Sequence, residues 1–419
     1  NGRRAVGERS TVYVYADWKG LGGPSLMGQL HRSVVRGEEV LAFEYDPFWL
    51  REGLPFALDP RLQLVAGRQY GDASGGAFGL FTDSAPDRWG RLLIQRREAL
   101  HAATKRRVLH DSDYLLAVTD RTRMGGLRFK LEPDEPFLAE ETALSVPPMQ
   151  QLRELEQASL GFESAQMEDP HYAGWLQMLL APGTSLGGAR PKASVVDPSG
   201  NLWIAKFPSR QDEYDVGAWE GLVHELAGRA GLRVGSGRTE AFSRAGHTFL
   251  CARFDREGQE RIHFASAMNL LGYKDGEGAR TGASYLDLVD FIERNGAGVE
   301  QDLAELWRRI VFNICIHNTD DHLRNHGFLL SDQGWYLSPA YDLNPQPWPG
   351  GLALNIDEAS NACDLDLARS VGRYFRLSEQ EQESILREVT AAVSGWEQLA
   401  SRRAVPRSEI ERMRGAFTV

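Results

Sequence analysis

An amphipathic helix, predicted over residues 303–315, ends at the most polar stretch of the chain. Its apolar side chains recur at the spacing of one helix face, namely Leu303, Leu306, Trp307, Ile310, Val311, Ile314 and Cys315. Such a stripe needs a core to cover it, so we expect a buried helix here. The chain then reads His317-Asn-Thr-Asp-Asp-His-Leu-Arg-Asn-His326, and a predicted hairpin leads on to Tyr341 and Asp342. Loops that are held by rigid elements are typical places for catalytic residues.

Composition restricts the class of protein. A chain of 419 residues has room for one to three domains, and 42% apolar with 25% charged residues is typical of a soluble globular protein. We find no apolar run long enough to span a membrane and no secretory signal pattern. Only three cysteines occur, far apart, which favours reduced thiols in a cytoplasmic protein over a zinc site or disulfides.

Charge argues against direct DNA binding. The net charge is −11, whereas a protein that grips DNA with its own surface usually carries a basic stripe. The basic clusters, at residues 88–97, 105–107 and 402–403, are short and are interpreted as solvated helix faces. We therefore expect little intrinsic affinity for nucleic acid.

The first part of the chain predicts a small antiparallel β unit. Strand-like alternation covers residues 11–15, 26–30 and 40–45, with turns rich in glycine and proline between them. A helix is predicted to start near Pro86, and a surface connection rich in proline and acidic residues covers 132–148.

A glycine-rich segment, residues 183–192, opens the second informative block. Such a loop can bring backbone N–H groups against phosphate oxygens, although most glycine loops are ordinary turns. Two strands follow, and Lys206 lies in the second, where a cation is costly unless an anion meets it or the side chain reaches solvent. Glu220 lies beside the apolar stripe of a helix predicted over 214–231, from which it could turn inward to pair with Lys206. A strand pair over 239–243 and 248–253 comes next, and the chain is predicted to be mainly helical from Phe264 onward.

Taken in order, these parts are those that phosphoryl transfer from a nucleotide requires. A lysine positioned by a glutamate holds the phosphates, oxygen ligands hold Mg²⁺, and a carboxylate orients the acceptor hydroxyl. Asp320 precedes Asn325 by five residues, the spacing of base and metal ligand in the protein-kinase catalytic loop. Asp342 follows a hairpin, where a second metal-binding aspartate is expected. Asp321 could also act as the base on chemistry alone, but the spacing favours Asp320.

The chain resembles the HipA-type serine/threonine kinase toxins of bacterial type II toxin–antitoxin systems. The matching segments are Ser185-Leu-Gly-Gly188-Ala-Arg-Pro-Lys192, Arg253-Phe254-Asp255-Arg256, Asn318-Thr-Asp320-Asp-His322-Leu-Arg-Asn325 and Pro339-Ala-Tyr341-Asp342. The N-terminal β unit and Pro86-Asp-Arg-Trp-Gly90-Arg resemble the accessory region of that family. The likeness extends over nearly the whole chain.

The resemblance implies a site that binds ATP and Mg²⁺. Asp320 would be the catalytic base, Asn325 and Asp342 the metal ligands, and Ser185 an autophosphorylated serine whose modification silences the enzyme. The residues expected at the nucleotide are Gly187, Gly188, Ala189, Arg190, Pro191, Lys192, Lys206, Glu220, Ala252, Arg253, Phe254, His322 and Tyr341. Glu220 is placed in this set by its helix position and by kinase logic.

It also implies an α+β, protein-kinase-like two-lobed fold. This fold has a mixed α/β N-terminal lobe and an all-helical C-terminal lobe. Residues 1–150 would form the accessory β-rich subdomain with helices, 151–255 the nucleotide-binding region of the N-terminal lobe, and 256–419 a mainly helical catalytic region. The expected substrate is a protein, an aminoacyl-tRNA synthetase such as glutamyl-tRNA synthetase, whose phosphorylation arrests growth. The expected partner is a helix-turn-helix antitoxin, which would supply contact with operator DNA.

Two other interpretations stay open from the sequence. A metal-dependent phosphohydrolase or nuclease could use a transition-metal cluster made of His317, Asp320, Asp321, His322 and His326. That cluster leaves Lys206 and the glycine loop without a function. A catalytically inactive protein of kinase fold is the second alternative, although every catalytic residue type is present.

Overall fold

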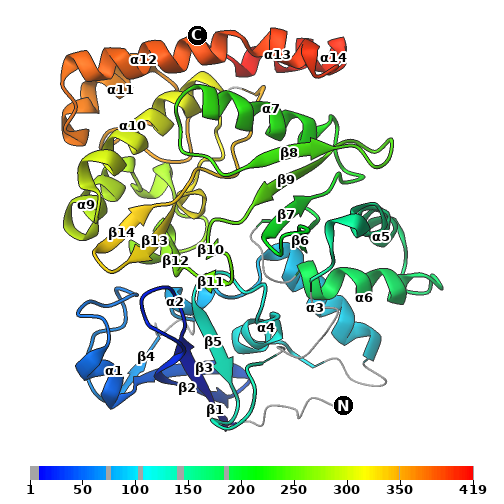
Figure 1. The fold of residues 1–419 in the computed structure, drawn as a ribbon, viewed down its shortest axis with the longest axis vertical. Helices are drawn as coiled ribbons and strands as arrows, with labels where there is room; N and C mark the ends of the chain where they lie inside the picture. The colour runs from blue at the N-terminus through cyan, green and yellow to red at the C-terminus, as the bar shows by residue number, and fades with distance from the viewer. Residues whose placement is uncertain are drawn as a thin grey trace. The chain divides into compact units, whose positions relative to one another are not determined.

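The computed structural model describes residues 9–71, 77–101, 107–138, 146–183, 188–348 and 350–418. It divides into two compact units, which Figure 1 shows in ribbon form. The first consists of Asn1–Ala205 with Asp255–Ala265, and the second of Lys206–Phe254 with Ser266–Val419. The chain therefore leaves the first unit after Ala205 and returns to it for eleven residues, while the division into 1–150, 151–255 and 256–419 stays a prediction.

The first unit contains a five-stranded antiparallel sheet in the order β4-β3-β2-β1-β5. The strands are β1 (Arg9–Ala16), β2 (Ser25–Val35), β3 (Glu38–Tyr45), β4 (Arg68–Tyr70) and β5 (Leu127–Lys130). Val12 and Val14 are buried in alternation with more exposed neighbours, as one buried sheet face requires. Gly28 has no room for a side chain, because a Cβ there would lie 2.3 Å from the Glu44 carbonyl oxygen. The predicted antiparallel β unit is confirmed.

Helices and two further pairs of neighbouring strands belong to the first unit. The helices are α1 (Pro47–Glu52), α2 (Gly79–Thr82), α3 (Arg88–His101), α4 (Asp111–Ala117), α5 (Leu152–Ser164) and α6 (Tyr172–Gly183). The strands β6 (Lys192–Val196) and β7 (Leu202–Lys206) are neighbours, and β10 (Arg256–Glu257) pairs with β11 (Glu260–Arg261). Helix α6 packs against both α3 and α5 (Figure 1). The helix predicted near Pro86 begins two residues later, at Arg88.

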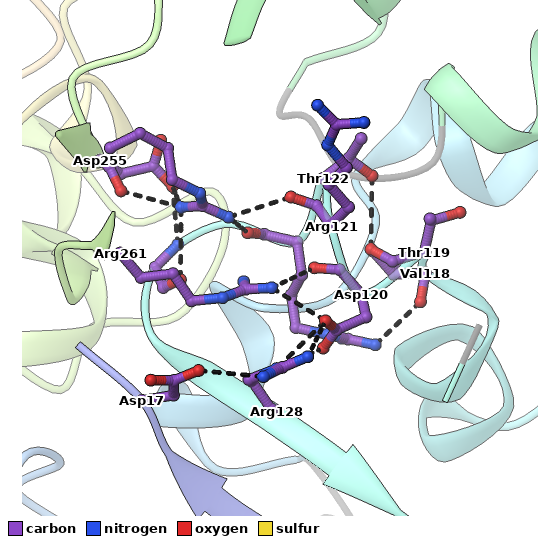
Figure 2. A network of polar contacts seen from close by, with 12 residues as sticks. Asp17, Val118, Thr119, Asp120, Arg121, Thr122, Arg128, Asp255 and Arg261 are labelled. Atoms are coloured by element: carbon purple, nitrogen blue, oxygen red, sulfur yellow. Dashed lines mark hydrogen bonds and ion pairs between the residues drawn. The ribbon is translucent and has the colours of Figure 1, made fainter. Parts of the chain in front are cut away.

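A buried ionic network ties β11 to the loop before β5 inside the first unit (Figure 2). The Asp120 carboxylate accepts from Arg128 at 2.6 Å and from Arg261 at 3.0 Å. Arg128 also donates to Asp17 at 3.0 Å. Burial by itself would raise the pKa of Asp120, but the Arg261 and Arg128 guanidinium groups outweigh it and hold that pKa below its ordinary value. Asp120 is therefore ionised and central to the network.

Hydrogen bonds and ion pairs of the same network hold the start of β10. Asp255 accepts from the backbone N–H of Gly125 at 2.9 Å and from Arg256 at 2.6 Å, and Arg256 donates to the Arg123 carbonyl at 2.7 Å. Arg123 is itself buried and donates to the Ser84 carbonyl at 2.8 Å. Segments far apart in sequence are thus joined by charge-assisted hydrogen bonds, which are stronger than neutral ones.

Replacing Asp120 with asparagine is expected to lower the free energy of unfolding of the first unit by about 3 kcal/mol at pH 7, because the buried Arg261 guanidinium loses its carboxylate partner and Arg128 keeps only Asp17. The folded-state pKa is depressed, so the contribution of the carboxylate is present above the unfolded pKa of about 3.9 and is lost as the pH falls through the folded pKa. Urea denaturation at several pH values should show the deficit shrinking below about pH 4. The exposed Asp134→Asn is the control; equal effects of both changes would contradict a structural role for Asp120.

The second unit is mainly helical. Its helices are α7 (Val216–Arg229), α8 (Ala267–Leu270), α9 (Tyr285–Asn295), α10 (Val299–Cys315), α11 (Leu365–Val371), α12 (Glu379–Ser394), α13 (Trp396–Arg402) and α14 (Arg407–Met413). Two hairpins are present, β8 (Gly237–Glu240) with β9 (Thr248–Ala252), and β13 (Gly327–Ser331) with β14 (Gly334–Leu337). Short 3₁₀ turns join them, including η3 (Leu323–Asn325).

Helix α10 forms the centre of this unit. Every residue of the predicted apolar stripe is at most 2% exposed, and the helix packs against α9, α11 and α12 (Figure 1). The buried Trp307 ring also donates its N–H to the Ala368 carbonyl at 3.0 Å, which fixes α11 on the helix. The predicted burial of this stripe is confirmed.

Several local predictions need correction. The stretch that begins at Phe264 was predicted helical, but β12 (Phe264–Ser266) is a strand. The first strand of the predicted pair lies at Gly237–Glu240, and residues 241–243 fall outside it. The hairpin predicted near residues 327–337 is confirmed. Within the described ranges Cys251, Cys315 and Cys363 take part in no disulfide, and no helix is both long and apolar enough to cross a membrane.

Candidate active site

A buried lysine held by two carboxylates is the centre of the site in the second unit. Lys206 donates from Nζ to Glu220 Oε1 in a short hydrogen bond and to Asp342 Oδ1 at 2.6 Å. Only 13% of the Lys206 side chain is exposed, so the predicted pairing with Glu220 is confirmed and the alternative, a side chain that reaches solvent, is wrong. Burial would lower the pKa of Lys206, but Asp342 and Glu220 outweigh it and raise that pKa above its ordinary value. The ammonium group is therefore charged.

Local structure explains how the three side chains meet. Asp215 caps α7 by accepting from the Ala218 N–H at 3.0 Å, and Glu220 follows on the buried side of the same helix. Asp342 has φ of +59°, a left-handed conformation that a non-glycine residue adopts only when its surroundings impose it. Two of those constraints are the bonds from the Ala340 N–H to the Arg233 carbonyl, 2.7 Å, and from the Tyr341 hydroxyl to Arg324, 2.6 Å.

Asp320 lies on the loop that leaves α10, and its side chain is exposed. Asn325 donates its amide N–H to the backbone carbonyl of Asp320 at 3.0 Å, and the His322 N–H donates to the same carbonyl at 2.9 Å. A hydrogen bond thus joins Asp320 and Asn325, the two residues whose five-residue spacing is noted in the sequence. The carboxylate of Asp320 is presented outward on a loop whose backbone is held.

The neighbouring carboxylate has the opposite environment. Asp321 is 2% exposed, and its Oδ2 accepts from Tyr285, Asn313 and His326. A general base has to come within hydrogen-bond reach of the hydroxyl that it deprotonates. Burial excludes Asp321 from such contact, so the exposed Asp320 is the better candidate of the two.

Two aromatic rings lie at the segment predicted to meet adenine. The centroids of Phe254 and Tyr341 are 5.5 Å apart, and both rings are half-buried. The preceding strand is held by the bond from the Ala252 N–H to the Ser236 carbonyl at 2.8 Å, and Arg253 is buried. His322 is half-buried, and within the part of the chain that the structure describes its Nδ1 has no hydrogen-bond partner. The part of these half-buried rings that is still accessible could stack on a planar base.

Of the predicted nucleotide loop, residues Gly188 to Lys192 belong to the first unit, while Ser185 and Gly187 lie outside the described residues. The Gly188 N–H donates to Asp87 in a short bond, and the Trp89 indole donates to the Lys192 carbonyl at 3.0 Å. Gly188 has φ of +90°, which favours glycine. Ala189 is exposed, Arg190 half-buried and Pro191 buried.

The sequence did not predict that Asp87 and Trp89 form hydrogen bonds with this loop. They belong to the segment Pro86-Asp-Arg-Trp-Gly90-Arg, which stood out in the sequence only as part of the accessory region. The motif itself was a signal, but nothing in the sequence joined it to residues one hundred positions later.

Comparison with known proteins agrees with the resemblance. The model of a family described as "HipA-like C-terminal domain" matches residues 184–396, more than half of the chain. The chain belongs to the HipA-like family. This HipA-like chain is also similar over 96% of its length to a chain of the solved complex of the Shewanella oneidensis MR-1 toxin–antitoxin system HipA, HipB and its operator DNA. That match covers 94% of the other chain, with a TM-score of 0.64 and 18% identity. The predicted α+β, kinase-like fold class is confirmed.

Two curated relatives from Sinorhizobium fredii (strain NBRC 101917 / NGR234) carry the names Putative kinase Y4mE and Putative kinase Y4dM. The first is 29% identical over 182 residues, 38% of this chain, and the second 29% identical over 162 residues, 35% of this chain. The matches span 41% and 37% of the length of these relatives.

The transition-metal cluster considered from the sequence does not assemble in the HipA-like chain. His317 Nε2 lies 2.9 Å from the Gly350 carbonyl oxygen, and His326 Nε2 lies 2.9 Å from Asp321. Among the residues that the structure describes, no group of three or more histidine, cysteine, aspartate or glutamate side chains is arranged to hold a metal ion. His317 is therefore paired with a backbone carbonyl and His326 with a buried carboxylate.

Asn325 and Asp342 suit magnesium by their chemistry. The Asn325 amide nitrogen donates to Asp320, so the oxygen is the end of that amide that can meet a cation. Asp342 is a carboxylate that already carries a cationic partner, Lys206. Mg²⁺ prefers oxygen ligands and keeps several waters, so an amide and one carboxylate form an adequate set.

Proposed function

We propose that this HipA-like chain is an ATP- and Mg²⁺-dependent serine/threonine protein kinase, the toxin of a toxin–antitoxin pair that acts in the cytoplasm. The observation that carries the proposal is Lys206, a buried ammonium held by Glu220 and Asp342. Only 13% of this side chain is exposed and its partners are carboxylates, so the surroundings of Lys206 are those of a cation that binds anionic groups. Nucleotide phosphates are such groups, and lysine, glutamate and aspartate in this chain order are the set that kinases use.

The positions of the side chains support a separate role for each residue. Lys206 would bind and orient the phosphates of the donor, and Glu220, which already accepts from Lys206, would keep the lysine in place. Asp320, exposed on its loop, orients the acceptor hydroxyl and takes its proton. Asn325 and Asp342 would hold Mg²⁺, which would supply positive charge against that of the phosphates. The remaining predicted nucleotide contacts are Gly187 to Lys192, Ala252 to Phe254, His322 and Tyr341.

Family membership supports a proposal for the substrate and the partners. We propose that the chain phosphorylates an aminoacyl-tRNA synthetase, with glutamyl-tRNA synthetase as the first candidate, and so arrests growth. The solved relative is recorded with HipB and its operator DNA. A helix-turn-helix antitoxin would give this acidic chain the same access to DNA, which its net charge of −11 disfavours by itself.

Self-labelling tests the activity without knowledge of the substrate. The purified chain, incubated with radiolabelled ATP and Mg²⁺, is expected to incorporate phosphate, and peptide mapping should place it on Ser185. Ser185→Ala should lose most of the label, whereas Ser199→Ala, at an exposed serine of the same unit, should keep it. If Ser185→Ala kept its label, the autophosphorylated residue would be one other than Ser185.

Phosphoproteomics identifies the substrate. Brief induction of the active chain, compared with Asp320→Asn, should enrich a phosphoserine or phosphothreonine on an aminoacyl-tRNA synthetase. Neither self-labelling nor a new phosphorylated protein in such an experiment would favour the inactive kinase-fold alternative.

A further inference from the structure

The HipA-like site contains a buried carboxylate that the proposed chemistry does not use. Asp321 follows the exposed Asp320 directly, yet it is only 2% exposed. Its Oδ2 accepts from the Tyr285 hydroxyl at 2.6 Å, the Asn313 amide at 2.7 Å and His326 Nε2 at 2.9 Å. All these donors are buried, at 0–1% exposure. An ionised group removed from water requires such compensation.

The donors come from different elements of the second unit. Tyr285 is the first residue of α9, Asn313 lies in the last turn of α10, and His326 follows η3. Burial alone would raise the pKa of Asp321, but His326 and the hydroxyl donor outweigh it and hold that pKa below its ordinary value. The Asp321 carboxylate thus joins, by hydrogen bonds, elements that are distant in sequence.

The partners of Asp321 are themselves anchored. The Asn313 Oδ1 accepts from the Asn318 amide at 3.1 Å, and its carbonyl accepts from the Asn318 N–H at 2.9 Å. The Tyr285 N–H donates to the Asn355 carbonyl at 3.0 Å, and the His326 carbonyl accepts from Ala267 at 2.8 Å. Displacement of Asp321 would therefore disturb both ends of the loop from Asn318 to His326.

We propose that Asp321 is a positioning residue, which pins the loop between Asp320 and Asn325 to α9 and α10 and so fixes the catalytic base relative to the metal ligand. The bond from the Asn325 amide to the Asp320 carbonyl transmits this constraint, since it closes the loop around Asp321. The effect on catalysis rests on the proposed kinase function, whereas the effect on the loop does not. Two adjacent aspartates thus have different tasks because one faces solvent and the other the core.

A pair of tyrosine substitutions separates this role from general stabilisation. Tyr285→Phe removes one donor to Asp321 and keeps the ring in the core. Tyr273→Phe is the matched control, because Tyr273 also donates to a carboxylate of α9, Asp287 at 3.0 Å, but makes no bond to the loop. Tyr285→Phe should lower kcat for self-phosphorylation about tenfold, the value of one hydrogen bond to a charged group, and leave KM for ATP nearly unchanged. Tyr273→Phe should leave both constants unchanged.

Asp321→Asn tests the carboxylate itself. It should lower kcat about a hundredfold, as expected when a reacting group is misplaced by about 1 Å, while ATP still binds. Hydrogen exchange of the folded chain provides a readout that is independent of activity. The amides of residues 318–326 should exchange faster in Tyr285→Phe than in the wild type and in Tyr273→Phe.

The outcomes are distinguishable. A wild-type chain that transfers no phosphate overturns the proposed kinase function, and the exchange experiment still decides whether Asp321 anchors the loop. An active wild type with equal kcat and equal loop exchange in Tyr285→Phe and Tyr273→Phe overturns the positioning role. If Asp321→Asn fails to fold, the tyrosine pair alone decides.

Discussion

Asp320→Asn is expected to lower the rate of phosphoryl transfer by the HipA-like chain about a thousandfold, within the range that general-base catalysis supplies. The amide has the shape of the carboxylate but does not accept a proton from a hydroxyl. Because the Asp320 side chain is exposed and only its backbone carbonyl holds Asn325, the fold and the affinity for ATP should be kept. Initial rates of self-labelling, with ATP affinity measured by calorimetry, give the two quantities separately.

Asp332→Asn is the matched control for this change. Asp332 is exposed at the tip of the β13–β14 hairpin, between Asn325 and Asp342 in the sequence, so the same loss of charge occurs in the same unit. Its rate should equal that of the wild type. Full activity of Asp320→Asn would remove Asp320 from the role of base.

Lys206→Met should lower kcat/KM by about a hundredfold to a thousandfold, the effect of deleting one preorganised donor to transferring charge. The same substitution should raise the affinity of the site for Mg²⁺. Lys206 Nζ lies 2.6 Å from Asp342 Oδ1 and competes with any cation there. Without nucleotide, titration with MgCl₂ should therefore show tighter binding to Lys206→Met than to the wild type.

The exposed Lys274→Met controls for the loss of one positive charge in the same unit. It should alter neither the transfer rate nor the affinity for Mg²⁺. Equal Mg²⁺ affinity in Lys206→Met and the wild type would show that Lys206 and the metal do not exchange at Asp342.

Local pattern was enough for much of the fold. The stripe on α10, the alternation in β1 to β3 and the β13–β14 hairpin depend on neighbours within a few residues, so periodicity and turn chemistry predict them. The same reasoning failed at β12, where a short apolar run has no periodicity to distinguish strand from helix. Strand identity there depends on pairing with residues distant in sequence.

The candidate site divides in the same way. Residue types and spacing, without tertiary structure, predicted one chemical set made of Asp320, Asn325, Asp342, Lys206 and Glu220, and the motifs indicated the family. The structure brings Lys206, Glu220 and Asp342 of this set into contact. The family can be recognised from the sequence alone, because its motifs consist of the side chains that the chemistry requires.

Only the tertiary structure decided which of two adjacent carboxylates faces solvent. Asp320 and Asp321 are identical in chemistry, and the difference between them lies in Tyr285, Asn313 and His326, which come from three separate elements. The link from Asp87 and Trp89 to residues 188–192, and the network around Asp120, are of the same kind. Burial and long-range hydrogen bonds depend on how elements pack, and no local pattern in the sequence encodes that packing.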